Sequence, residues 1–211
     1  TEDFVHNGND ASPANLEMEN PVIATDGRIF LHGWLGRPRA ARHEAQVLEE
    51  DWAAATELDC LGVDAALYEG SEGLRVVAAG EYGGLGCWDG TTGAEMWRVP
   101  LPEAYATPTV DPASGRIYLP VGGGSIWVAG LDRDGQALWD EPARLCYSGE
   151  SGGDSQRAFG VGCLSHDGHT YYFRTSGLNH SGSLYAIATG TGAVKWTFPT
   201  GSQGWAQQTV S

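Results

Sequence analysis

The stretch Ser183-Leu-Tyr-Ala-Ile-Ala-Thr-Gly-Thr-Gly-Ala-Val-Lys-Trp196 decides the fold, because its pattern recurs along the chain. In it, a tryptophan follows a turn glycine by four residues. The same offset occurs at Gly93 to Trp97, Gly135 to Trp139 and Gly192 to Trp196. Glycine suits such turns because it accepts positive φ and lets another group approach the backbone closely. Self-similarity at a period near ~40 residues indicates a repeat architecture.

A second signal precedes each tryptophan and consists of a turn glycine followed by alternating apolar residues. These glycines are Gly27, Gly73, Gly115 and Gly168. Such alternation after a tight turn is typical of a β-strand. Gly73 to Trp97 spans 24 residues, and Gly27 to Trp52 spans 25, so a fourth, degenerate unit ends at Trp52.

Each unit has room for about four strands in ~42 residues, which is the size of one propeller blade. We therefore predict an all-β fold, a β-propeller of four-stranded antiparallel blades within a single domain, 1–211. The predicted blades cover about 20–52, 60–99, 106–141 and 160–198, with a fifth begun at 205–211.

Residues 36–58 are ambiguous, because they are rich in helix formers. Read alone they predict a helix of about four turns. Read through the repeat, they supply the third and fourth strands of the first blade. We favour strands, because tertiary context often overrides propensity.

The four cysteines allow three disulfide pairings. Cys146 and Cys163 bracket a Gly/Ser-rich insert, 146–163, which we interpret as an exposed loop pinned by a disulfide between them. Cys60 and Cys87 are the other candidate pair. Two carboxylates of the insert, Glu150 and Asp154, are candidate calcium ligands, although carboxylates in a loop are more often solvated.

Composition restricts the partners. The net charge of −15 argues against nucleic acid, which requires clustered basic residues. No apolar run approaches the ~18 residues of a membrane span. Because the chain begins with Thr1 rather than methionine, we expect a processed mature form, an excised fragment or an expression product.

The segments Ala129–Trp139 and Tyr185–Trp196 resemble the tryptophan-docking repeat of the PQQ-like (quinoprotein-type) β-propellers. Pro21–Leu31 is similar to the inner-strand part of that repeat, and the resemblance covers about Asp3 to Ser211. It implies that the docking tryptophans lie between blades, where a large indole fills the gap and its N–H finds a backbone acceptor. These residues are Trp52, Trp97, Trp139 and Trp196, with Gly93, Gly135 and Gly192.

The resemblance implies two possible functions. Some members are alcohol or sugar dehydrogenases that hold PQQ and calcium, and others are non-catalytic, such as an outer-membrane assembly lipoprotein. The dehydrogenases carry an adjacent cysteine pair, which this chain lacks. We therefore expect a non-catalytic extracytoplasmic scaffold for binding or assembly, without a cofactor. The alternative is part of a PQQ- and calcium-dependent dehydrogenase.

Rings of this family usually have about eight blades, so four blades make half a ring. An open arc exposes sheet edges and an apolar blade face. We expect further chain, a protein partner or a second copy to complete the ring.

Two other motifs carry less weight. Gly149-Glu-Ser-Gly-Gly153 fits a hydrolase pattern around Ser151 but lacks the strand and helix that a nucleophile elbow requires. His166 and His169 flank a turn without a third metal ligand.

Overall fold

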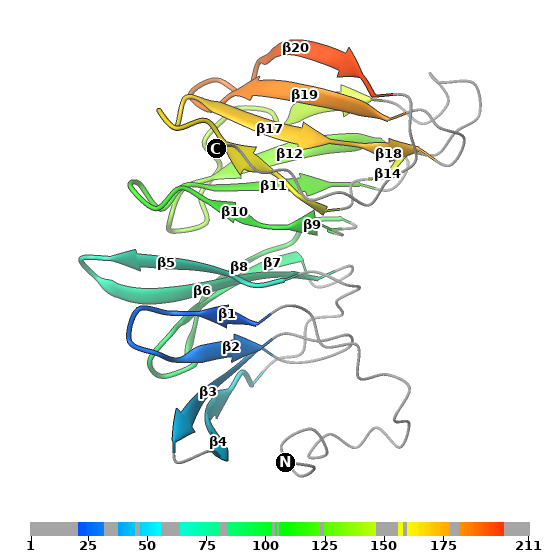
Figure 1. Ribbon diagram of the computed structural model, residues 1–211. Coiled ribbons are helices and arrows are strands. Elements are labelled where there is room, and N and C mark those ends of the chain that lie inside the picture. The colour runs from blue at the N-terminus through cyan, green and yellow to red at the C-terminus, as the bar shows by residue number, and fades with distance from the viewer. Residues whose placement is uncertain are drawn as a thin grey trace.

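The computed structural model describes residues 21–31, 38–44, 47–55, 64–80, 84–102, 104, 106–122, 125–146, 156–157, 160–177 and 182–200. They form strands and turns, so the described part contains no helix that could cross a membrane. Four antiparallel four-stranded sheets follow one another along the molecule, from the first at the bottom of Figure 1 to the fourth at the top. The predicted all-β class is confirmed, and the sheets match part of a β-propeller.

We call these sheets blades one to four. Within each, every strand pairs with the next one in chain order. Blade one contains β1 (Val22–Ile23), β2 (Ile29–Leu31), β3 (Arg39–Glu44) and β4 (Val47–Ala53). Blade two contains β5 (Ala66–Gly70), β6 (Gly73–Gly80), β7 (Gly84–Asp89) and β8 (Glu95–Val99). Blade three contains β10 (Thr109–Val110), β11 (Ile117–Val121), β12 (Ile126–Leu131) and β13 (Ala143–Cys146). Blade four contains β16 (Cys163–Leu164), β17 (Thr170–Arg174), β19 (Ser183–Ala188) and β20 (Val194–Pro199).

The ambiguous stretch around residues 36–58 forms the two outer strands of blade one. The strand interpretation is confirmed for β3 and β4, which pair from Arg39 with Ala53 to Glu44 with Val47. Ala40 and Ala41 are fully buried, so their small side chains fit where the sheet is closely covered. Packing therefore overrides the local preference for a helix.

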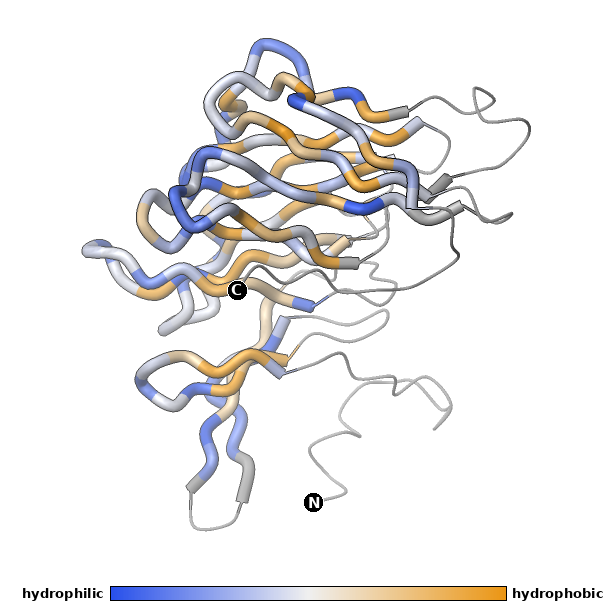
Figure 2. The backbone as a smooth tube through the Cα atoms, turned by 45° about the horizontal axis from the view of Figure 1, so that its top comes forward, coloured by the Kyte–Doolittle hydropathy of each residue, from blue (hydrophilic) through white to orange (hydrophobic). Residues whose placement is uncertain are grey.

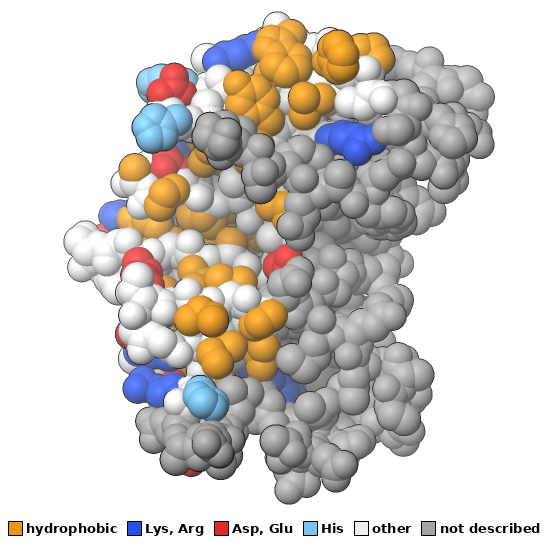
Figure 3. Space-filling model, in the orientation of Figure 1, with side chains coloured by type: hydrophobic (Ala, Val, Ile, Leu, Met, Phe, Trp, Pro, Cys, Tyr) orange, Lys and Arg blue, Asp and Glu red, His pale blue; other side chains and the backbone are white. Residues whose placement is uncertain are grey.

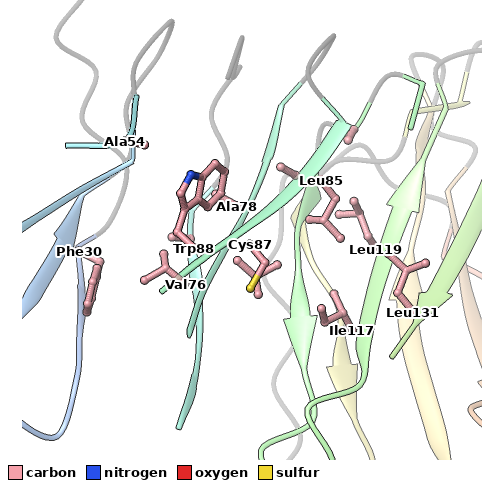
Figure 4. Close-up of a cluster of buried hydrophobic side chains, with 14 of the residues drawn as sticks. Phe30, Ala54, Val76, Ala78, Leu85, Cys87, Trp88, Ile117, Leu119 and Leu131 are labelled. Carbon is pink, nitrogen blue, oxygen red and sulfur yellow. The ribbon is translucent and has the colours of Figure 1, made fainter. Parts of the chain in front are cut away.

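The core lies between the blades, and successive side chains of one strand face opposite neighbours. In blade two, Val76 and Trp88 point toward Phe30 of blade one, whereas Leu85 and Cys87 point toward blade three (Figure 4). The tube in Figure 2 shows hydrophobic residues concentrated on the strands and hydrophilic residues at many of the turns. Burial on both faces explains why these central strands are rich in apolar residues.

Blades three and four share a second, aromatic cluster. Tyr118 of β11 stacks on Tyr171 of β17, with ring centroids 5.4 Å apart, and Tyr171 stacks on Phe173 at 6.5 Å. All three side chains are buried. These large rings fill the gap between blades three and four.

Part of the insert 146–163 is ordered into short strands. β14 (Gln156–Arg157) pairs with β18 (Ser176–Gly177), and β15 (Gly160–Val161) runs parallel to β9 (Ala106–Thr107). Since β9 leads into blade three and β15 into blade four, this pairing joins the entrances of two neighbouring blades. The predicted fifth blade, 205–211, lies outside the described residues.

The structure does not form the predicted disulfides, because Cys163 and Cys87 are free thiols in it. Cys146 ends β13, the last strand in the order of blade three, whereas Cys163 begins β16, the first strand of blade four. The two cysteines therefore lie on different blades, and Cys163 is not bonded to a second cysteine. Cys60 and the side chain of Cys146 lie outside the described residues.

Candidate docking surface on the fourth blade

The contact between blades one and two consists of an indole ring seated on a glycine turn. The Trp52 ring of blade one lies against Gly93 of blade two, and its Nε1 donates a hydrogen bond to the Gly90 carbonyl at 3.1 Å. Gly93 has a φ of +71°, and a Cβ there would lie 2.6 Å from ring atoms of Trp52. The turn therefore requires glycine for both its backbone conformation and its closeness to the ring.

The next two contacts repeat this geometry. They join Trp97 to Gly135 and the Arg133 carbonyl, and Trp139 to Gly192 and the Thr189 carbonyl. The two indole N–H groups donate at 2.9 and 3.0 Å. A Cβ would approach the ring to 2.9 Å in one case and 2.7 Å in the other. In the described part of the chain, each of the first three blades therefore places a tryptophan on the glycine turn of the following blade.

Two arginines strengthen the first two contacts. Arg28 of blade one donates from Nη1 to the Gly90 carbonyl, the same oxygen that accepts the Trp52 N–H. Arg75 of blade two likewise donates to the Arg133 carbonyl at 2.6 Å. The sequence analysis missed these residues, although Arg28 directly follows Gly27 and Arg75 comes two residues after Gly73. An arginine within two residues after a turn glycine is the signal that could have identified them.

The Arg75 guanidinium is also paired with carboxylates. Its Nη2 lies 2.9 Å from Glu72 and its Nη1 lies 3.2 Å from Asp134 of blade three. Arg133 contacts the other oxygen of Glu72 at 2.9 Å. The Arg75 side chain is only 7% exposed. Glu72 and Asp134 compensate its charge at the contact between the blades.

Within the described residues, the outer strand of blade four has the same pattern, and no further blade covers it. Trp196 and Phe198 occupy positions in β20 that correspond to Trp97 and Val99 in β8, both of which contact the Gly135 turn. Trp196 is 45% exposed and Phe198 is 61% exposed, whereas Trp139 is 8% exposed. Figure 3 shows hydrophobic side chains gathered at the top of the molecule, where β19 and β20 lie. We call the side of β20 that carries Trp196 and Phe198 the fourth-blade face.

Neighbouring side chains hold this face in place. The Tyr172 ring of β17 lies 5.9 Å from the Trp196 ring, at an interplanar angle of 42°. Lys195, the only lysine of the chain, donates from Nζ to Thr170 Oγ1 at 2.6 Å. These contacts fix the side chains of β20 against strand β17 of the same blade.

Carboxylates at the turns are engaged in local hydrogen bonds. Ser165 Oγ donates to Asp167 at 2.5 Å and the His169 N–H donates at 3.0 Å, and together they hold the pKa of this carboxyl below its usual value. Glu69 accepts both the N–H and the hydroxyl of Thr25, which lower its pKa in the same way. These acids stabilise turns and contacts between blades.

Comparison with known proteins places the chain in a family. The family model described as outer membrane protein assembly factor BamB matches residues 39–208. The chain belongs to this family of PQQ-like propellers. A comparison with curated proteins found no match.

Solved structures of similar propeller proteins share the fold of this chain. BamB from Moraxella catarrhalis has a TM-score of 0.55 and 20% identity, over 85% of this chain and 47% of its own. Quinohemoprotein alcohol dehydrogenase from Comamonas testosteroni has a TM-score of 0.64 and 17% identity, over 87% and 35%. A quinoprotein alcohol dehydrogenase-like protein from Bacteroides thetaiotaomicron has a TM-score of 0.52 and 15% identity, over 86% and 45%. The chain therefore spans about a third to a half of the length of these proteins.

A calcium site beside PQQ would require several oxygen ligands in one place. No three His, Cys, Asp or Glu side chains among the described residues lie close enough to share a metal ion. The calcium candidates Glu150 and Asp154 lie outside the described residues, as does Ser151. His166 and His169 are exposed on their turn. No two cysteines are adjacent in the sequence.

Proposed function

We propose that this chain is a non-catalytic scaffold for binding or assembly, and that the fourth-blade face is one of its contact surfaces. The observation that carries the proposal is the exposure of Trp196 and Phe198 in a pattern that is covered at the other blades. Full burial of a large apolar side chain stabilises a structure by about 1.5 to 3 kcal/mol. Covering this face therefore provides a substantial driving force for association.

The family supports this proposal. Its model is described as an outer membrane protein assembly factor, and BamB from Moraxella catarrhalis shares the fold. We extend the proposal to an extracytoplasmic location and to a protein partner. The partner is the polypeptide that continues the ring, either as a further part of a longer chain or as another subunit.

The structure offers a physical reason to favour a scaffold. Turn carboxylates such as Asp167 and Glu69 accept hydrogen bonds from the turns themselves, and Glu72 is paired with Arg75. Side chains bound in this way stabilise the blades rather than present a reactive group. The dehydrogenase alternative rests on solved structures whose sequences are less than 25% identical to this chain. These structures show a shared fold.

A cofactor titration tests the proposal against this alternative. PQQ and calcium are added to the 211-residue chain, and the cofactor absorbance and dye-linked oxidation of a primary alcohol are followed. The scaffold proposal predicts neither saturable binding nor alcohol oxidation. Stoichiometric PQQ binding accompanied by dye reduction would overturn it.

A further inference from the structure

The fourth-blade face also specifies what can cover it. We propose that its occupant is a blade with a glycine turn between its third and fourth strands, and that the first blade of a second copy of this chain does not qualify. This inference rests on the proposed function, because it identifies the partner class of the same face. It separates two ways of completing the ring, by a distinct blade or by an identical chain.

The three observed contacts define the requirement. Each acceptor turn has a glycine at positive φ, between +71° and +80°, whose Cα hydrogen faces the indole. A Cβ at any of these glycines would lie within 2.9 Å of the ring, closer than side chains tolerate. A backbone carbonyl two or three residues earlier accepts the indole N–H. A blade that covers Trp196 in this way must supply both groups.

Blade one follows the other blades up to the turn and then differs. Ala40 pairs with Trp52 as Cys87 pairs with Trp97, and a register shift follows both pairs. In blade two the chain then leaves the ladder for the turn at 89–94, where the Gly93 N–H bonds to the Asp89 carbonyl.

In blade one the ladder continues instead. Three further pairs join Arg42 to Glu49, His43 to Leu48 and Glu44 to Val47. Leu48 precedes Trp52 by four residues and thus occupies the position of the docking glycine. A ladder residue with a leucine side chain offers neither the positive φ nor the bare Cα that the indole requires.

The other blades of a second copy are also unsuitable. Their glycine turns, at Gly93, Gly135 and Gly192, are covered by the copy's own Trp52, Trp97 and Trp139. The described part of the chain therefore has four docking tryptophans but three glycine turns of this kind. Identical copies joined end to end would leave the Trp196 of each copy without an acceptor turn.

A turn graft in the full chain tests this inference. Residues 42–49 are replaced by the sequence of residues 89–94, which converts the end of the blade-one hairpin into a glycine turn. Sedimentation velocity is then measured over a wide concentration range for the wild type, the graft and the graft combined with Trp196→Ala. We expect the graft to self-associate and Trp196→Ala to abolish that association. The wild type should show no association that depends on Trp196.

A matched control isolates the glycine. The same graft carrying leucine at the position that corresponds to Gly93 should sediment like the wild type. Circular dichroism and the urea midpoint verify that each variant is folded. A wild-type dimer that Trp196→Ala dissociates would overturn the inference, as would a folded graft that remains monomeric. Neither outcome depends on PQQ, so failure here is distinguishable from failure of the scaffold proposal.

Discussion

Blades two and four end in outer strands of the same design but differ in what covers them. In β8, Trp97 and Val99 pack on the Gly135 turn of blade three, and the indole donates to the Arg133 carbonyl. In β20, Trp196 and Phe198 are 45% and 61% exposed. The same alternation of large apolar residues therefore gives a partly buried contact between blades in one place and an exposed surface in the other. What decides between them is the glycine turn of the next blade.

The largest expected effect comes from removing one tryptophan from each kind of environment. Trp139→Ala should lower the free energy of unfolding by about 3 to 5 kcal/mol, because it empties a buried contact. Trp196→Ala should change it by less than about 1 kcal/mol, because that ring is half exposed. Urea denaturation followed by circular dichroism measures both. Equal losses would mean that the two rings contribute alike to the fold.

A smaller effect is expected for the glycines of a single turn. Gly192→Ala should destabilise the protein by about 2 to 4 kcal/mol, because its φ is +72° and the new Cβ would lie 2.7 Å from the Trp139 ring. Gly190→Ala is the matched control and should stay within about 0.5 kcal/mol, because nothing lies near its added Cβ. The two urea midpoints provide the comparison. A tolerated Gly192→Ala would remove the steric requirement on which the docking geometry rests.

Arg75 at the contact between blades should contribute less to the free energy of unfolding than the indole ring of Trp139. Arg75→Met should cost about 1.5 to 3 kcal/mol, because it removes a charged donor from the Arg133 carbonyl and leaves Glu72 and Asp134 without this partner. Arg98→Met serves as the control, since the Arg98–Glu95 pair is partly exposed and should contribute less than about 1 kcal/mol. Thermal or urea unfolding of both variants at low and high salt tests the difference. If Arg98→Met costs as much as Arg75→Met, burial at the blade contact has no special role.

The smallest change in the free energy of unfolding near neutral pH is expected for Cys87, which is buried between blades two and three. Burial raises the pKa of its thiol to about 12, partly opposed by the charge of Arg75. The unfolded chain ionises this thiol at lower pH than the folded chain does. The stabilisation is thus complete below about pH 9 and is lost as the pH rises toward 12.

Unfolding free energies of the wild type and Cys87→Ala, measured from neutral to alkaline pH, test this expectation. The wild type should lose more stability than the variant above about pH 9. Native Cys87 should also react slowly with a thiol reagent at neutral pH. Parallel pH profiles for the two proteins would contradict the raised pKa.

Local signals in the sequence predicted the all-β fold of four-stranded antiparallel blades. The four-residue offset from Gly93 to Trp97 recurs twice in the chain. At each blade contact the indole packs closely on a turn glycine of the next blade, and this contact restricts both positions to these residue types. Trp52 was found through its distance from Gly27, even though its own hairpin lacks the glycine. The stretch around Ala40 is rich in helix-forming residues but forms strands, because packing between blades outweighs helix propensity. In the sequence, only the repeat pattern indicated this outcome.

Other features depend on where the blades lie relative to one another. The Cys146–Cys163 disulfide was predicted from a loop bracketed by cysteines, but these residues lie at opposite ends of neighbouring sheets. Arg28 and Arg75 were overlooked because their carbonyl acceptors come from the next blade, 62 and 58 residues away. The exposure of Trp196 likewise follows from the blade beside it rather than from its own motif.

Hydroxyl-radical footprinting of the 211-residue chain, read out by mass spectrometry at individual tryptophans, tests the central claim most directly. The structure predicts that Trp196 is oxidised much faster than Trp52 and Trp139, which are each 8% exposed. Protection of Trp196 to the level of Trp139 would contradict the existence of a free docking face on blade four.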